Sequence, residues 1–329
     1  MTNNTASPRV DVYLTGDDLR NALRTDADRG LRSTPKDIPP KWFYDTRGSQ
    51  LFDDITRLPE YYPTRCERAI LVERAPEIAA VTNADTLVEL GSGTSDKTRI
   101  LLDALRDAGT IARFVPFDVS EQTLRDAAAS VNQEYPSVTV HAVVGDFEHH
   151  LASIPHEGRR LIAFLGGTIG NFTPGSRRRF LRGLARLLRP GIDHLLLGTD
   201  LVKDPRILEA AYDDAAGITA AFNRNVLNVL NRELGADFDV AAFEHVAFFD
   251  REHEWIEMRL RASRRMSVHI AALGLDVEFA PREELRTEIS AKFTPQRLAD
   301  DLAAAGLNLE QVLKDDAGQF ALSLSTPAG

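Results

Sequence analysis

The chain has 329 residues, of which 43% are hydrophobic and 27% charged, a composition typical of a globular protein with about two domains. Its net charge of 39 − 49 = −10 argues against nucleic acid or an anionic membrane as the main partner, because both favour basic surfaces. The single cysteine, Cys66, excludes an internal disulfide, and no apolar run approaches the roughly 18 residues of a membrane span. With no signal-peptide pattern at the start, we expect a cytoplasmic protein, and we expect no metal site.

The first 82 residues show no regular alternation of strands and helices. Residues 1–15 are polar and predict no element, and residues 17–32 predict an amphipathic helix. The next segment is rich in proline and aromatic residues, which favours irregular structure around a short helix near residues 50–57. A further helix is expected over residues 67–82.

From residue 86 onward, short apolar runs alternate with helical patterns. Strands are predicted at residues 86–93, 114–120, 138–147, 161–172 (with a turn) and 194–202, and helices at 97–107, 121–135 and 175–188. Strands separated by helices of this length form right-handed βαβ units around a parallel sheet. This part of the chain is therefore predicted to be an α/β domain.

The pattern changes again near residue 203. A helical stretch is predicted at residues 204–234, antiparallel strands at 243–262 and 266–280, a helix at 294–305 and a closing hairpin at 309–316 and 319–325. The sheet is thus predicted to be interrupted by an inserted piece at about residues 203–292.

Two domains are expected from these patterns. The first, an α/β domain, comprises residues 66–202 plus 293–329, and the second, an α+β domain, comprises residues 1–65 plus 203–292.

The first motif with chemical meaning is VELGSGTSDK, residues 88–97. Glu89 ends a predicted strand, and Gly91 and Gly93 allow a sharp turn that brings the backbone close to a ligand. A dinucleotide-binding fingerprint would place a third glycine at position 96, where Asp96 stands and would repel a pyrophosphate. The motif favours a nucleoside without phosphates, although a tight turn without a ligand is the plainer alternative.

Acidic residues end the next two predicted strands. Asp118 can accept hydrogen bonds from both hydroxyls of a ribose, and Asp146 followed by Phe147 suits an adenine, whose amine the carboxylate accepts and whose ring the phenyl group packs against. Each could instead be a simple strand-end turn. The order of the three motifs, each at the carboxyl end of a strand, resembles class I S-adenosylmethionine-dependent methyltransferases, whose sheet is Rossmann-like.

The segment LGGTIGNF, residues 165–172, ends the fourth strand of the predicted sheet. Thr168 and Asn171 lie among three glycines, where a substrate amine could be held near the methyl group of such a cofactor. A glycine-rich turn packed for steric reasons is the alternative.

Longer segments resemble one family among these enzymes, the histidine-specific Nα-methyltransferases of ergothioneine biosynthesis. The matching segments are PPKWFYD (39–45), LPEYYPTR (58–65), VELGSGTSDKTR (88–99), FLGGTIGN (164–171), LGTDLVKD (197–204), AYDDAAGITAAFNRNVL (211–227) and TEISAKF (287–293). The resemblance implies transfer of three methyl groups from S-adenosylmethionine to the α-amino group of L-histidine, which gives hercynine. It also implies that the second domain binds this substrate.

The resemblance implies a role for each matching residue. Those implied for the cofactor are Gly91, Lys97, Asp118, Asp146 and Phe147. Asn171 and Tyr212 would hold the carboxylate of histidine, and the residues implied around its imidazole are Tyr61, Met258, Glu288 and Ser290. Those implied around the reacting amine are Tyr44, Phe52 and Thr168, with Tyr44, Thr168 and Asn171 as the catalytic set. We expect a monomer with no obligate protein partner.

Three alternatives compete with this interpretation. An enzyme of the same fold could methylate another amino acid, such as tyrosine or tryptophan, but Glu288 and Met258 favour histidine. A nicotinamide-dependent oxidoreductase is disfavoured by Asp96. A silent cofactor-binding module is disfavoured by the complete set of implied substrate residues.

Overall fold

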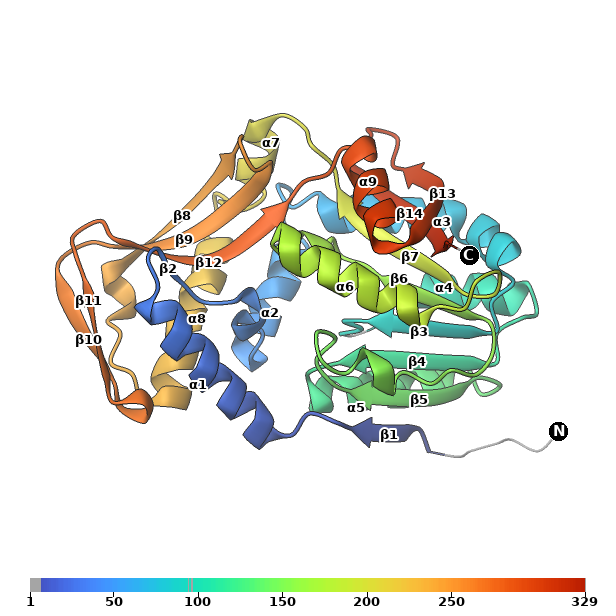
Figure 1. Ribbon diagram of the computed structural model, residues 1–329, viewed down its shortest axis with the longest axis horizontal. Coiled ribbons are helices and arrows are strands. Elements are labelled where there is room, and N and C mark those ends of the chain that lie inside the picture. Colours follow the sequence, from blue (N-terminus) through green and yellow to red (C-terminus); the bar gives the residue numbers. More distant parts are fainter. Residues whose placement is uncertain (1–6, 94, 96, 329) are drawn as a thin grey trace. The chain divides into compact units, whose positions relative to one another are not determined.

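The computed structural model describes residues 7–93, 95 and 97–328, and the chain forms two compact units (Figure 1). The first unit comprises the described parts of Met1–Thr15, Cys66–Leu201 and Phe293–Gly329. The second comprises Gly16–Arg65 and Val202–Lys292. Among the described residues, no helix has the length and apolar character that crossing a membrane requires.

Eight strands of the described chain form one sheet in the first unit. They are β1 (Arg9–Val12), β3 (Thr86–Leu90), β4 (Arg113–Asp118), β5 (Thr139–Val144), β6 (Arg160–Phe164), β7 (His194–Asp200), β13 (Leu307–Lys314) and β14 (Phe320–Pro327). Their order is β1-β5-β4-β3-β6-β7-β14-β13, parallel from β1 to β7 and antiparallel for the last two strands. This arrangement confirms the predicted Rossmann-like α/β sheet.

Helices cover both faces of this sheet. On one face, α3 (Pro63–Thr82), α4 (Thr98–Asp107) and α5 (Glu121–Glu134) contribute buried apolar side chains to a common core with the strands. On the other face, α6 (Pro174–Leu187) packs against β14 and against α9 (Pro295–Ala305), which in turn packs on β13 (Figure 1). Because both faces of the sheet are buried, the strand sequences are continuous apolar runs and do not alternate between apolar and polar residues.

The strand order places a switch point beside β3. From β3 the chain continues outward to β4 and β5, and then returns to the other side of β3 as β6. In open α/β sheets the crevice outside the carboxyl ends of the strands at such a point binds ligands. The turns that follow β3, β4, β5 and β6 are therefore the expected position of a site.

The second unit, described throughout, contains a smaller mixed sheet. Its strands follow the order β2 (Lys36–Asp37), β12 (Glu284–Ala291), β9 (Trp255–Ala262) and β8 (Phe243–Asp250). A separate ribbon consists of β10 (Met266–Ile270) and β11 (Leu275–Phe279). The helices are α1 (Gly16–Arg32), α2 (Thr46–Ile55), α7 (Pro205–Ala210) and α8 (Ile218–Leu234). Helix α8 packs on α2 and on the β8–β9 pair.

Five short 3₁₀ helices complete the described chain. They are η1 (Pro40–Phe43), η2 (Leu151–Ser153), η3 (Thr168–Asn171), η4 (Val240–Ala242) and η5 (Ala271–Leu273).

The structure differs from the sequence-based expectation in three places. Residues 9–12, for which no element is predicted and which are assigned to the second domain, form β1 and pair with β5 in the first unit. The predicted helical stretch at residues 204–234 is broken between α7 and α8. Residues 284–291, for which no element is predicted, form the strand β12.

A buried ion pair holds the start of β6 to the start of β7. Arg160 and Asp193 are both fully buried, and Asp193 Oδ2 accepts a 2.6 Å hydrogen bond from Arg160 Nη2. The same carboxylate accepts hydrogen bonds from Arg189 Nε and from the backbone nitrogens of Arg160 and Arg189. Burial opposes ionisation, but the hydrogen bonds from Arg189 and Arg160 outweigh it and hold the pKa of Asp193 below its usual range.

Replacing Asp193 by Asn should destabilise the protein strongly. We expect Asp193→Asn to lower the free energy of unfolding by about 3–5 kcal/mol, because it leaves the Arg160 guanidinium buried without its counter-charge. Asp107 forms an exposed ion pair with Arg106, and Asp107→Asn should change the free energy of unfolding by less than about 0.5 kcal/mol. Urea unfolding of both variants measures the difference. Equal, small effects would contradict a structural role for the buried pair.

Candidate active site

A glycine turn links the end of β3 to the end of β4. Gly91 and Gly93 have φ angles of +72° and +48°, a conformation that glycine adopts without strain, and a Cβ at either would meet open space. The Gly91 nitrogen donates a 2.8 Å hydrogen bond to the carbonyl of Phe117, and the Gly93 nitrogen donates a 3.0 Å bond to Asp118 Oδ2. Two of the predicted cofactor residues, Gly91 and Asp118, are thereby brought together.

The carboxylate of Asp118 is held at the end of β4 by backbone hydrogen bonds. Its Oδ1 accepts a hydrogen bond from the Ser120 nitrogen, in addition to the bond from Gly93 to Oδ2. A carboxylate can accept about four hydrogen bonds, so it retains acceptor capacity. Burial raises the pKa of Asp118, and hydrogen bonds from the backbone of Ser120, Gly93 and Val119 lower it only in part. A ligand that donates hydrogen bonds here would stabilise the ionised form. Asp96, which bears on the type of ligand, lies outside the described residues.

Asp146 and Phe147 follow β5, as the sequence predicts. Asp146 Oδ1 accepts a 2.8 Å hydrogen bond from the Glu148 nitrogen. Phe147 packs against three other phenylalanines, with ring centroids 5.4 Å from Phe164, 6.1 Å from Phe172 and 5.6 Å from Phe180. The phenyl ring is therefore fixed by an aromatic cluster and remains half-buried.

The segment after β6 carries two further predicted residues. Thr168 and Asn171 begin and end the 3₁₀ helix η3, and Thr168 Oγ1 donates a 3.0 Å hydrogen bond to the carbonyl of Leu165. Both residues are placed at the same edge of the sheet as Gly91, Asp118 and Asp146, because they all follow the carboxyl ends of parallel strands.

Glu67, which was not singled out from the sequence, connects these segments. This residue of α3 is fully buried, and its carboxylate accepts hydrogen bonds from Lys97 Nζ and, at 2.7 Å, from the nitrogen of Gly166. A Cβ on Gly198 in β7 would collide with the same carboxylate. The sequence does contain a signal, since Glu67 lies on the face of α3 that carries Ile70 and Leu71. An acidic residue on an apolar helix face needs a buried partner.

The side chain of Glu89 ties the glycine turn to the start of α4. It is buried at the end of β3, and its Oε2 accepts a 2.7 Å hydrogen bond from Ser92 Oγ and a second bond from Thr98 Oγ1 at the start of α4. Burial raises the pKa of Glu89 to about 7, although the two hydroxyl donors lower it in part. The carboxyl group of Glu89, which holds the turn, therefore binds a proton more tightly than an ordinary glutamate does.

The second unit contains the remaining predicted residues. The rings of Tyr44, Phe52, Tyr61 and Tyr212 form a chain of edge-to-face contacts, with successive centroids 5.6, 6.2 and 6.3 Å apart. Such contacts fix the rings relative to one another. Tyr212 lies in the break between α7 and α8, and its hydroxyl is 2.7 Å from Ser290 Oγ.

Strands β9 and β12 place three further predicted residues on one face. Met258 and Glu288 are directly opposite each other in the antiparallel pairing, and Ser290 follows Glu288 by two positions. Side chains that are directly paired, or two residues apart on one strand, share a face of the sheet. Met258 is almost completely buried and Glu288 is half-buried, which suits a site that combines an apolar wall with a carboxylate.

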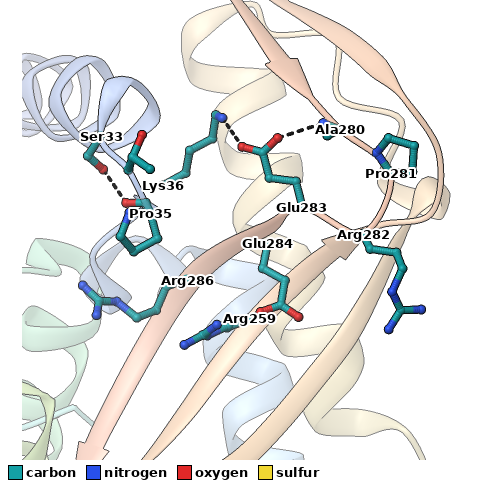
Figure 2. A pocket seen from close by; sticks show the side chains of 11 residues that line it. Ser33, Pro35, Lys36, Arg259, Ala280, Pro281, Arg282, Glu283, Glu284 and Arg286 are labelled. Atoms are coloured by element: carbon teal, nitrogen blue, oxygen red, sulfur yellow. Dashed lines mark hydrogen bonds and ion pairs between the residues drawn. The ribbon is translucent and has the colours of Figure 1, made fainter.

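A separate hollow of the second unit has a volume of about 540 Å³ but includes none of the predicted site residues (Figure 2). Its charged side chains largely pair with one another: Lys36 with Glu283, and Arg259 with Glu284 at 2.7 Å. Figure 2 shows Arg282 and Arg286 pointing away from each other rather than toward a common centre. The hollow is therefore lined by a structural ion-pair network.

The titratable residues show no metal centre in the described part of the chain. No group of three or more His, Cys, Asp or Glu side chains there is arranged to hold a metal ion.

Comparison with known proteins gives a consistent result. Residues 23–327 match the family described as histidine-specific, S-adenosylmethionine-dependent methyltransferase. The histidine N-alpha-methyltransferase of Mycolicibacterium smegmatis is 59% identical over 95% of this chain and 97% of its own length. That of Mycobacterium tuberculosis is 60% identical over 92% of this chain and 94% of its own. Ergothioneine biosynthesis protein 1 of Neurospora crassa is 35% identical over 61% of this chain, which corresponds to 23% of that longer protein.

The fold, the motifs at the sheet edge and the family match define this chain as an S-adenosylmethionine-dependent methyltransferase. Within that class it belongs to the family of histidine-specific methyltransferases, which confirms the resemblance seen in the sequence.

The raised pKa of Glu89 predicts a specific pH dependence of stability. Because the pKa is about 7 in the folded protein and 4.5 ordinarily, the native state binds a proton between these values that the unfolded chain releases. The contribution of Glu89 to stability is therefore most favourable below pH 4.5 and is lost as the pH rises through 7.

We expect Glu89→Gln, which is neutral at every pH, to raise the free energy of unfolding at pH 8 by up to about 3 kcal/mol and to change it little at pH 5. Urea unfolding at both pH values measures this. The exposed Glu73 provides the control, since Glu73→Gln should show no such difference between the two pH values. An equal effect of Glu89→Gln at pH 5 and pH 8 would contradict the assigned ionisation.

Proposed function

We propose that the protein transfers three methyl groups from S-adenosylmethionine to the α-amino group of L-histidine, producing hercynine, the first step toward ergothioneine. The observation that carries this proposal is the 59% identity, over 95% of the chain, to a relative named histidine N-alpha-methyltransferase. The similarity to a fungal protein named for ergothioneine biosynthesis supports the proposal that the product is used to make ergothioneine.

The residues at the edge of the large sheet fit S-adenosylmethionine. We propose that Asp118 accepts hydrogen bonds from the ribose hydroxyls, and that Asp146 and Phe147 bind the adenine. The open space beside Gly91 and Gly93 allows close approach to the backbone, and Lys97, held by Glu67, completes the set. The bound cofactor supplies a methyl group on a positively charged sulfur, so the donor needs no further activation.

Two groups of residues are proposed to recognise histidine. Glu288 accepts a hydrogen bond from one ring nitrogen of the imidazole, Ser290 contacts the other, and Tyr61 and Met258 pack against the ring. Asn171 and Tyr212 donate hydrogen bonds to the carboxylate of the amino acid. An apolar aromatic substrate would leave Glu288 without its partner, and a loss of this kind can reduce binding about 10⁴-fold.

The reacting amine must be neutral, because a protonated nitrogen has no free electron pair. We propose that Tyr44, which is 44% exposed, or a water molecule beside Thr168, relays the proton from the amine to solvent. Asn171 holds the substrate in line for transfer, since correct alignment alone can lower the barrier by about 7–11 kcal/mol. Phe52 and Tyr44 would stabilise the cationic methylated product through cation–π attraction.

The monomeric state and the cytoplasmic location stay predictions from the sequence. We also propose that the first unit, which includes β1, binds the cofactor and that the second unit binds the substrate.

The direct test is mass spectrometry of the purified protein incubated with S-adenosylmethionine and each of the twenty amino acids separately. We expect histidine alone to gain up to three methyl groups. Methylation of tyrosine or tryptophan instead would retain the cofactor site and overturn the imidazole assignment. No methylation of any amino acid would contradict the proposed activity.

Glu288 offers a sharper test of substrate choice. Removing a charged hydrogen-bond acceptor should weaken histidine recognition, so we expect Glu288→Ala to raise the KM for histidine about 100-fold and to improve relative activity with tryptophan. The exposed Glu278 of β11 provides a matched control, and Glu278→Ala should leave both parameters unchanged. An unchanged KM in the Glu288 variant would contradict its role at the imidazole.

A further inference from the structure

Asn223 and His245 form a buried polar pair in the second unit that the sequence motifs did not assign to any role. Asn223 lies on α8, within the segment 211–227, and His245 lies on β8. Asn223 is fully buried, and the side chain of His245 is 3% exposed. We propose that the two are positioning residues that hold Tyr212 and Glu288 in place to bind the carboxylate and the imidazole of the substrate. This inference rests on the proposed function.

The hydrogen-bond partners fix the orientation of the Asn223 amide. Its Nδ2 lies 3.1 Å from the carbonyl oxygen of Arg259 and 2.8 Å from His245 Nδ1. A backbone carbonyl only accepts hydrogen bonds, so the amide atom beside it is the nitrogen, whose two hydrogens match its two contacts. An amide turned by a half-rotation would place two acceptor oxygens face to face in a buried position, which is strongly unfavourable.

The same reasoning determines where His245 carries its proton. Its Nδ1 faces a donor and therefore accepts, which requires a neutral ring with the hydrogen on Nε2. Nε2 lies 2.8 Å from the carbonyl oxygen of Tyr212, which is again an acceptor. Because the series of hydrogen bonds ends at a backbone carbonyl on both sides, a single arrangement of hydrogens satisfies all of these contacts.

The hydrogen bond from His245 ties the segment between α7 and α8 to β8. Asp214 fixes the other end of this segment, since its carboxylate accepts hydrogen bonds from the nitrogens of Ile218 and Thr219 at 3.0 and 2.7 Å. These are two of the backbone donors that the first turn of a helix leaves unpaired. The backbone that carries Tyr212 is thus held by β8 on one side and by α8 on the other.

A β-bulge beside Glu288 contacts the same asparagine. The register of β12 against β9 shifts between Arg286 and Glu288, so Thr287 is the extra residue. Thr287 is buried, and its Oγ1 lies 2.6 Å from Asn223 Oδ1 and 3.0 Å from the carbonyl oxygen of Met258. A bulge redirects the side chains next to it, so the contact between Asn223 and Thr287 sets the direction of Glu288.

The residues beside this asparagine contact the segment proposed to surround the reacting amine. The ring centroid of Phe222 lies 5.6 Å from that of Tyr44 and 6.0 Å from that of Phe52. Asn225 Nδ2 donates a 2.7 Å hydrogen bond to Asp45 Oδ1, on the residue that follows Tyr44. One turn of α8 therefore contacts this segment as well as the bulge in β12.

The surroundings of His245 favour its neutral form. Burial lowers the pKa of His245 below the ordinary value of 6.5, and the positive charge of Arg224 acts in the same direction. The hydrogen bond to Tyr212 and the charges of Asp213 and Asp214 raise this pKa, but only in part. The Asp213 carboxylate lies 3.9 Å from Nε2 and is 63% exposed, so water screens its charge.

The kinetic experiment compares His245→Phe, Asn223→Leu and the double variant with the parent enzyme. KM and kcat are measured for L-histidine, and cofactor affinity is measured by calorimetry with S-adenosylhomocysteine. We expect each single variant to raise the KM for histidine about 30-fold, with cofactor affinity unchanged within about twofold. Since the two residues act through one series of hydrogen bonds, the double variant should exceed Asn223→Leu by less than about threefold. Multiplicative effects, or an unchanged KM in the single variants, would overturn the proposal.

Asn231 on the same helix supplies a matched control. Its Nδ2 donates a 2.9 Å hydrogen bond to the carbonyl of Phe238, and its Oδ1 accepts one of 2.9 Å from the nitrogen of the same residue. Asn231→Leu removes these local contacts and should change the KM for histidine less than about threefold. His245→Gln, which retains an N–H donor, should recover part of the loss seen in His245→Phe.

L-Histidinamide, which lacks the carboxylate, separates positioning of Tyr212 from a general defect. His245→Phe and Tyr212→Phe should both lower the ratio of kcat/KM for histidine to that for histidinamide, by about tenfold or more. A general defect affects both substrates equally, so an unchanged ratio in His245→Phe overturns the proposal. An unchanged ratio in Tyr212→Phe refutes the role of Tyr212 at the carboxylate and this inference with it.

Nitrogen-15 NMR of protein labelled at the histidine rings tests the protonation of His245 without substrate. The signals of His245 are those that disappear in His245→Gln. At pH 6 we expect a neutral ring with its proton on Nε2, whereas a doubly protonated ring, or a proton on Nδ1, would overturn the proposal. Failure of the parent enzyme to methylate histidine would instead refute the proposed function and would leave this NMR signature unchanged.

Discussion

One buried carboxylate, that of Glu67, connects the segments on both sides of the switch point in the large sheet. It binds Lys97 before α4 and the backbone of Gly166 after β6, and a Cβ at position 198 in β7 would collide with it. An unpaired carboxylate at full burial would be strongly unfavourable, so these contacts must form together. The turns that are proposed to meet the cofactor and the reacting amine therefore have a common structural support rather than separate ones.

Two buried carboxyl groups near the carboxyl edge of the sheet have raised pKa values. Burial raises the pKa values of both Asp118 and Glu89, which means that neither carboxyl group is fully stabilised in its ionised form by the protein alone. A ligand that donates hydrogen bonds at the proposed cofactor site would compensate for this at Asp118. Sites of this kind are less stable than the surrounding fold because their polar groups are arranged for a ligand rather than for one another.

Most of the large sheet could be predicted from the sequence because its signals are local. Each apolar run lies within a few positions of the glycines or the acidic residue that end it, as with Gly91 and Gly93 after the first run and Asp118 after the second. By contrast, β1 is only four residues long, too short for a recognisable period, and it is defined by pairing with β5 more than 120 positions away. Glu67 and Asn223 were missed for the same reason, since the meaning of a buried polar side chain depends on partners distant in the sequence.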